Sequence, residues 1–151
     1  MKKLHLVALL GLFAAFCGFV FTSCGDDDDP SNPIVGTWSL TETDSQQNMS
    51  FTTTTSITFT ADGKYTLSEE GVHKSPDFEE KYGSRENGTY KLDGNTLTLT
   101  ATGFAYLEPD GRWMEEGNRE NEPWTQEIAI EGKTLHIALW QGGDQLALKK
   151  Q

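Results

Sequence analysis

Apolar and polar residues alternate with a period of two along most of the chain after residue 33. This period is typical of β-strands with one buried face, because successive side chains point to opposite faces of a sheet. No window keeps a helical period over three turns. The pattern predicts eight short strands, at residues 34–42, 50–60, 64–69, 88–92, 96–104, 125–130, 134–140 and 145–150.

Most of these strands are joined by short turn sequences that contain glycine. They are ADG at 61–63, DGN at 93–95, EGK at 131–133 and GGD at 142–144. Such turns are typical of β-hairpins, and eight sequential antiparallel strands can close on themselves and so remove both sheet edges. We therefore expect an all-β, eight-stranded antiparallel up-and-down barrel without a long helix. The alternative is a two-sheet sandwich, which usually needs longer crossing connections.

The first 23 residues have the composition of a signal peptide rather than of a fold element. Two lysines follow Met1, every residue from Leu6 to Phe21 is apolar or glycine, and Thr22-Ser23 precede Cys24. This order of a positive, an apolar and a small polar region marks a secretory signal. The apolar run is also shorter than the roughly 20 residues of a membrane-spanning helix.

The residues FTSC at 21–24 resemble the lipobox of bacterial lipoproteins. The resemblance implies cleavage after residue 23 and a lipid, such as palmitate, on Cys24. That family prefers leucine at the position of Phe21, and an ordinary signal peptide or an uncleaved anchor is the alternative reading. We expect residues 1–23 to be a lipoprotein signal peptide and the membrane to be reached through lipid on Cys24.

Four aspartates follow the cysteine, namely Asp26, Asp27, Asp28 and Asp29. Adjacent like charges repel and Pro30 and Pro33 oppose regular structure, so residues 24–33 are predicted to be a lipidated, acidic, flexible tether. The acidic run also resembles the surface-export signal of Bacteroidota lipoproteins. That resemblance implies a lipid-anchored outer-membrane protein exposed at the cell surface; the alternative is a tether and nothing more.

The remaining domain, residues 34–151, is acidic and has no cysteine. Loss of the leader removes Lys2 and Lys3, so residues 24–151, with the tether included, carry ten basic and 23 acidic residues, a net charge of −13. Such a charge argues against nucleic acid as a partner. Cys17 lies in the leader, so with Cys24 acylated the mature chain has no disulfide and no cysteine-based metal site. About 120 residues are a normal size for one domain.

The first strand contains Gly36-Thr37-Trp38, which resembles the Gly-x-Trp signature of lipocalins and fatty-acid-binding proteins. The stretches ITFTADGKYTL and GTYKLDGNTLTLT are similar to small lipocalin-like domains of bacterial lipoproteins. In lipocalins this Trp closes one barrel end beneath a basic residue of the last strand. The resemblance therefore implies that Gly36 and Trp38 form a structural barrel end, with Lys149 or Lys150 above the ring. The usual arginine and the long C-terminal helix of secreted lipocalins are absent.

Two segments, 70–87 and 105–124, lack strand periodicity and are expected to be long irregular connections. The second carries Tyr106, Trp113 and Trp124. Aromatic side chains on a polar connection either contact a ligand at the barrel mouth or fold back and plug it. We predict these three residues as the ligand-binding residues, with the plug as the open alternative.

The sequence does not predict an enzyme. The adjacent carboxylate pairs 69–70, 79–80 and 115–116 do not fix the separation that glycosidases need. The mature histidines are His73, expected in the first long connection, and His136, expected on the outward side of a strand; they supply no His₃ zinc site. No nucleophile elbow, phosphate-binding loop or dinucleotide fingerprint is present. No catalytic residue, metal or cofactor is predicted.

Taken together, these features predict a membrane-anchored, surface-exposed lipoprotein. Its barrel is expected to bind a small hydrophobic or amphipathic ligand. The alternative function is a protein- or glycan-interaction module whose barrel is filled by its own side chains. The volume of the interior separates the two, because ligand cavities usually reach a few hundred Å³.

Overall fold

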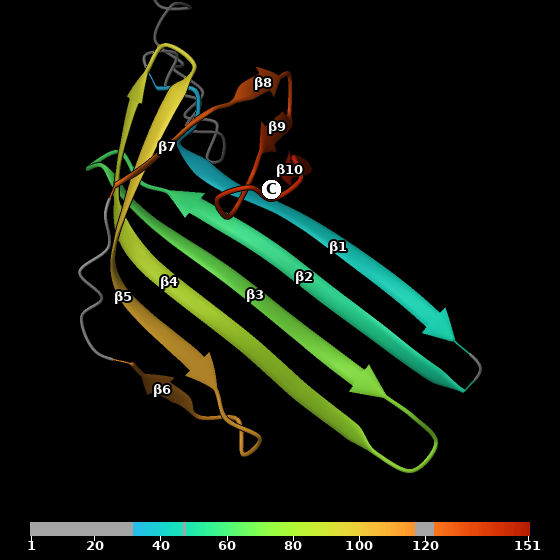
Figure 1. Cartoon of the computed structure of the whole chain (residues 1–151). Helices are drawn as coiled ribbons and strands as arrows, with labels where there is room; N and C mark the ends of the chain where they lie inside the picture. The colour runs from blue at the N-terminus through green and yellow to red at the C-terminus, as the bar shows by residue number, and fades with distance from the viewer. Residues whose placement is uncertain (1–31, 47, 117–122) are drawn as a thin grey trace, which may run out of the picture.

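The computed structural model describes residues 32–46, 48–116 and 123–151. The predicted signal peptide, Cys24 and the four aspartates lie outside these residues. Within the described residues, ten strands form one antiparallel sheet (Figure 1). Their bounds are β1 Gly36–Gln46, β2 Met49–Phe59, β3 Lys64–Lys74, β4 Glu79–Asp93, β5 Thr96–Leu107, β6 Trp113–Glu115, β7 Trp124–Glu127, β8 Ala129–Glu131, β9 Thr134–Ile137 and β10 Leu146–Lys150.

The strand order is β6-β5-β4-β3-β2-β1-β10-β9-β8, with β7 also paired to β5. The prediction of an all-β, antiparallel, up-and-down fold is confirmed. The turns behave as predicted too, since Gly63, Gly94 and Gly132 have the positive φ angles that tight turns require.

The prediction of eight strands in a closed barrel is corrected to ten strands in a sheet whose order ends at β6 and β8. The expected strand at 125–130 divides at Ile128: β7 pairs with β5, whereas β8 pairs with β9. The Ile128 N–H bonds to the carbonyl of Asn95, at the turn before β5, where the chain leaves that strand. The other strand that the sequence pattern did not predict is β6, which folds back on the C-terminal end of β5.

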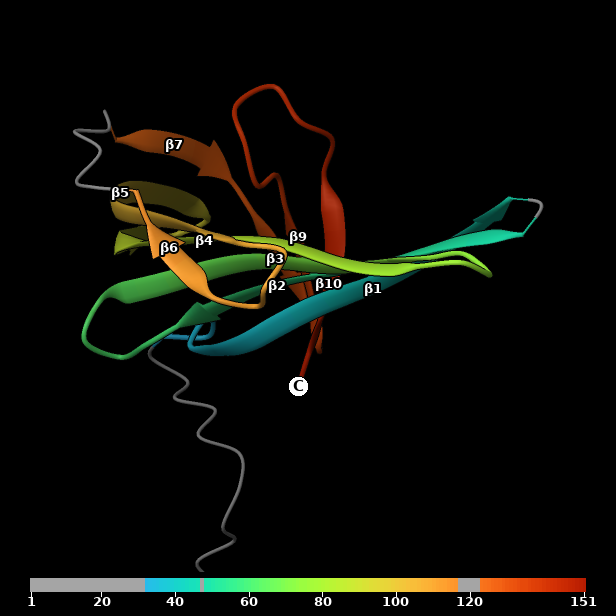
Figure 2. The same cartoon turned by 90° about the horizontal axis from the view of Figure 1, so that it is seen from below.

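Strands β1, β3 and β4 are longer than the sequence pattern predicts, and the far ends of β1 to β4 project beyond β9 and β10 (Figures 1 and 2). The segment 70–87, expected to be irregular, is therefore mostly strand, and only residues 75–78 form a turn. The segment 105–124 likewise begins within β5 and contains β6. Periodicity missed these parts because a strand that extends past the core has no buried face, so its residues need not alternate.

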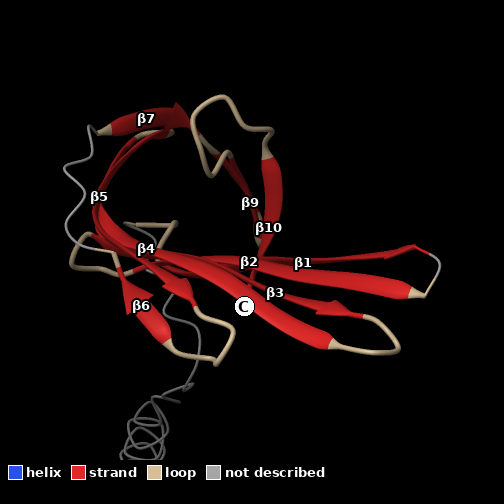
Figure 3. Ribbon diagram, turned by 60° about the horizontal axis from the view of Figure 1, so that its bottom comes forward, coloured by secondary structure: helices blue, strands red, loops and turns tan. Residues whose placement is uncertain are grey.

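The sheet has an inner face, which carries the core, and an outer face. Strands β4, β5, β7, β9 and β10 are arranged around this interior (Figure 3). Side chains from most strands fill it: Ile34, Trp38, Ile57, Phe59, Tyr65, Tyr90, Leu97, Leu99, Ile128, Leu135, Ile137, Leu139 and Leu148. Because this cluster is contiguous and buried, the interior is a packed core and not an open channel.

The Gly-x-Trp stretch of β1 forms part of this core. Trp38 is 1% exposed, and its indole Nε1 donates a hydrogen bond to the Ile34 carbonyl at 2.7 Å. Lys150 Nζ lies 5.5 Å from the centroid of the ring. A side chain at Gly36 would reach to 3.0 Å from Lys150 Cε, and the φ angle of Gly36 is +126°, which favours glycine. Lys149 instead donates to Thr134 on β9.

Candidate functional site

A cavity of about 120 Å³ opens on the inner face, beside the packed core. Strands β2 to β5 form its floor, and the segment that follows β9 forms its other side. The lining residues are Thr55, Leu67, Glu69, Ser84, Glu86, Phe104, Leu139 and Trp140. Four of them are apolar or aromatic, and the other four carry hydroxyls or carboxylates. We call this opening the inner-face cavity.

The segment after β9 is held in place by hydrogen bonds to β7. The Gln126 side chain donates to the Ala138 carbonyl at 2.8 Å and accepts from the Ala138 N–H at 2.9 Å. The Trp140 carbonyl accepts from the N–H of Gly143, and the indole packs so closely on Gly143 that a Cβ there would overlap it. Leu139 is therefore buried at the cavity, and Trp140 covers its rim while remaining 54% exposed.

Two carboxylates enter the inner-face cavity from neighbouring strands. In the β3–β4 register Glu69 lies opposite Ser84 and Leu67 lies opposite Glu86, so all four side chains share the inner face. The Tyr65 hydroxyl donates to Glu86 Oε1 at 2.6 Å. Burial, and then this contact with the Glu86 carboxylate, raises the pKa of Tyr65 well above its usual range. Tyr65 therefore remains a hydrogen-bond donor that fixes the position of Glu86.

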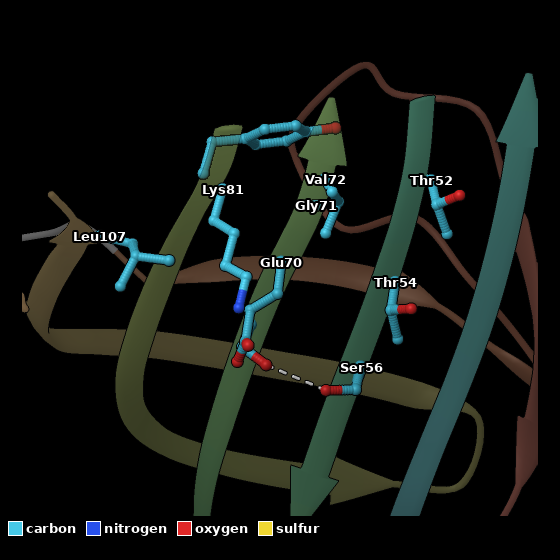
Figure 4. Close-up of a pocket in the computed structure, with 10 residues that line it drawn as sticks. Thr52, Thr54, Ser56, Glu70, Gly71, Val72, Lys81 and Leu107 are labelled. Atoms are coloured by element: carbon cyan, nitrogen blue, oxygen red, sulfur yellow. Dashed lines mark hydrogen bonds between the residues drawn. The ribbon is translucent and has the colours of Figure 1, made fainter. Parts of the chain in front are cut away.

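A second, larger depression of about 460 Å³ lies on the outer face of the projecting strands. In Figure 4 Thr52, Thr54 and Ser56 follow one another along β2, and the side chains of Lys81 and Glu70 point toward each other. Its hydroxyls already satisfy one another across strands: Ser56 with Ser68 at 3.0 Å, Thr54 with Thr41 at 2.9 Å and Thr52 with Thr43 at 3.2 Å. This arrangement stabilises the sheet. Glu70 and Lys81 bring charges of opposite sign to the depression.

The structure does not place Tyr106, Trp113 and Trp124 around one cavity. Tyr106 is on the inner face next to Ser84 but is 41% exposed. Trp113 pairs with Leu107 and lies under the Arg85 guanidinium, 4.2 Å from the ring centroid, on the outer face. Trp124 pairs with Leu99 at the opposite end of β5 and packs against the core. Ligand contact by these residues stays a prediction.

The histidines are separate from the inner-face cavity. His73, expected in a loop, lies on β3, where it stacks on Phe51 at 4.1 Å and meets Phe78 edge-on at 4.8 Å between ring centroids. His136 lies on β9, and its Nε2 is 3.7 Å from a carboxylate oxygen of Glu131. In the part of the chain that the structure describes, no three His, Cys, Asp or Glu residues cluster as metal ligands.

The carboxylate pairs of the sequence do not act as pairs. Glu69 and Glu70 are adjacent on β3 and therefore point to opposite faces, one into the inner-face cavity and one into the outer depression. Sequence reasoning named Glu69 only within a carboxylate pair that predicted no site, and it did not single out Glu86, Phe104, Leu139 or Trp140. The parity of β3 and β4 carries a signal for the carboxylates, but Trp140 reaches the cavity only because its segment folds back over the sheet.

The comparisons with known proteins agree with this architecture. A family model described as a lipocalin-like domain matches residues 34–137. A search of curated proteins gave no match. Within residues 32–46, 48–116 and 123–151, no helix has the length and apolar character that crossing a membrane requires.

Proposed function

Since the chain belongs to the lipocalin-like domain family, we propose that it is a binding protein whose inner-face cavity holds a small amphipathic ligand. This family is typically a non-enzymatic binding fold. One observation carries the proposal: the cavity combines an apolar side, with Leu67, Phe104 and Leu139, and a polar side with two carboxylates. Ligand sites are usually mostly apolar with a few placed polar groups.

The sheet supports such a site because Ile128 links β7 to β8, which lie at opposite edges of the sheet. β7 pairs with β5 on one side of Ile128, and β8 pairs with β9 on the other. We infer that this link lets the sheet enclose an interior as a barrel does. The packed core fills one end of that interior, and the inner-face cavity opens at the other. A cavity of about 120 Å³ is below the roughly 300–1,000 Å³ of whole-ligand pockets, so it accepts one end of a ligand and leaves the rest at the mouth.

A second candidate function is an interaction module, and two observations favour it. The interior is largely filled by the chain's own side chains. In addition, Met49, Phe78 and Tyr82 are exposed large hydrophobic residues on the projecting strands and their turn, and such residues often mark interaction surfaces. In that case the inner-face cavity would bind no small ligand, and the test below separates the two functions.

Ligand binding is tested by titrating the full-length protein with octyl compounds that have neutral, cationic or anionic ends, followed by tryptophan fluorescence and calorimetry. We expect at least one compound to bind, because the cavity offers both an apolar wall and polar groups. Trp140→Leu should remove most of the fluorescence change. Phe78→Leu, an exposed aromatic side chain on the turn between β3 and β4, is the control and should leave binding unchanged. Absence of binding by every compound would favour the interaction module.

We further propose that the protein is a lipoprotein anchored through Cys24 and exposed at the surface of a Bacteroidota-type outer membrane. The support is the lipobox-like FTSC, the positive and apolar leader before it, and the run Asp26 to Asp29 behind it. The domain that follows is acidic and begins its first strand at Gly36, so a tether of about ten residues separates lipid from fold.

Cys24→Ala should abolish lipid attachment and release the protein from the membrane fraction, because no other cysteine remains after the leader. The measurement is metabolic labelling with a clickable palmitate analogue, followed by membrane fractionation. Protease shaving of intact cells, with the parent chain and a chain carrying alanines at 26–29, reports which face the domain occupies. Label retained on the Cys24→Ala chain would contradict lipid attachment at Cys24. Equal protease cleavage of the parent and alanine chains would show that the aspartates serve as a tether and not as an export signal.

A further inference from the structure

We propose that the inner-face cavity selects ligands whose polar end is an organic cation, that is, an amine or quaternary ammonium group on an apolar body. This inference rests on the proposed function, because it names the ligand class of the same cavity. It follows from the charges that line the cavity, from the aromatic rings beside them and from the size of the opening.

The charge of the lining has one sign. Glu69 and Glu86 are the ionisable side chains among its eight residues, and neither lysine, arginine nor histidine belongs to the lining. The two carboxylates are diagonal neighbours on β3 and β4, since Glu69 faces Ser84 and Glu86 faces Leu67. Diagonal positions are about 7–8 Å apart along the sheet, so one small group between them can contact both.

Glu69 and Glu86 are half-buried, and the surroundings strengthen the effect of their charges. Thr55 beside them is buried, and the cavity adjoins the packed core, so water screens charge there less than at the surface. Tyr65 holds Glu86 in place through its hydroxyl and brings no positive charge. The whole chain is also acidic, with a net charge of −11, which raises the local concentration of cations. An anionic end group would be repelled at every stage of binding.

Aromatic rings complete a cation site. Phe104 and Trp140 line the same cavity as the carboxylates, and Leu67 and Leu139 provide the apolar wall. The faces of aromatic rings attract cations, and quaternary ammonium groups are commonly bound in cages of aromatic rings. The outer face shows the same kind of contact, where the Arg85 guanidinium lies 4.2 Å from the Trp113 ring centroid. A volume of about 120 Å³ suits an ammonium head group better than a complete ligand.

The test compares three probes of equal chain length, octyltrimethylammonium, octanol and octanoate, by calorimetry with the full-length protein. We expect the cation to bind at least tenfold more tightly than octanoate, with the affinity of octanol between them. We expect added salt to weaken the binding of the cation but not the binding of the other two probes. If none of the three binds, the proposed function itself fails. If octanoate binds as tightly as the cation, ligand binding stands and the cation preference is overturned.

Charge-removing variants locate the effect. Glu69→Gln and Glu86→Gln should each weaken cation binding about tenfold and affect octanol binding much less, because octanol carries no charge. Glu70→Gln is the matched control, because it removes the same charge from the next residue of β3 but on the outer face. If Glu86→Gln perturbs folding through Tyr65, Glu69→Gln still decides the outcome. Equal weakening by the Glu70 variant would overturn a local site in favour of general surface charge.

Discussion

Replacement of Trp38 by alanine is expected to lower the free energy of unfolding by about 3–5 kcal/mol, the usual cost of deleting a core aromatic side chain. The ring is 1% exposed and belongs to the cluster that fills the sheet's interior. Its loss also leaves the Ile34 carbonyl without the indole N–H that now donates to it at 2.7 Å. The contact with Lys150 above the ring disappears as well.

The measurement is equilibrium unfolding in urea, followed by circular dichroism so that the missing tryptophan does not affect the signal. Trp140→Ala is the matched control, because this ring is 54% exposed and should contribute far less to stability. A Trp38→Ala protein as stable as the parent would show that the Gly-x-Trp stretch does not organise the core.

Gly88→Ala is expected to have the second-largest effect, a destabilisation of about 3 kcal/mol, at the upper end of what overpacking typically costs. Gly88 lies on β4 at the β-bulge, where the register with β5 shifts between Asn87 and Gly88. A Cβ there would overlap the carbonyl oxygen of Thr100 and stand 2.5 Å from Cε1 of Tyr65. The carbonyl belongs to the backbone of the neighbouring strand and cannot move without opening the sheet.

Two other glycines provide controls for this prediction. Gly103→Ala should change stability by less than about 0.5 kcal/mol, because no atom lies within 4 Å of the added methyl group. Gly71→Ala should fall between the two, because there the methyl group meets the side-chain ring of Tyr82, which can rotate away. Urea unfolding of the three variants checks the order, and equal effects at positions 88 and 103 would contradict it.

The same substitution connects stability to the binding site. If the methyl group at position 88 displaces the Tyr65 ring, the hydroxyl loses its 2.6 Å contact with Glu86 and the inner-face cavity changes shape. A Gly88→Ala protein that still folds should therefore bind the preferred ligand more weakly. The bulge thus serves both the fold and the candidate site.

The sequence by itself determined the all-β, antiparallel, up-and-down fold, the alternation of buried and exposed positions and the turns. Alternation of apolar and polar residues defines the buried face of each strand wherever that strand crosses the core, as at Trp38, Ile57 and Leu97. The turn glycines were recognisable because tight hairpins need positive φ angles, which glycine adopts at little cost. Both signals are local, and local patterns are what one sequence can reveal.

Tertiary structure alone decided the length of the strands, the division at Ile128 and the composition of the candidate site. Strand β3 extends as far as Lys74 and β4 begins at Glu79, because backbone groups of neighbouring strands form hydrogen bonds there. Such backbone pairing does not require an apolar pattern. The cavity brings Glu69 and Glu86 together with Trp140, more than 50 positions away along the chain. Alternation could place each residue on a face, but only the folding of the segment after β9 over that face brought them together.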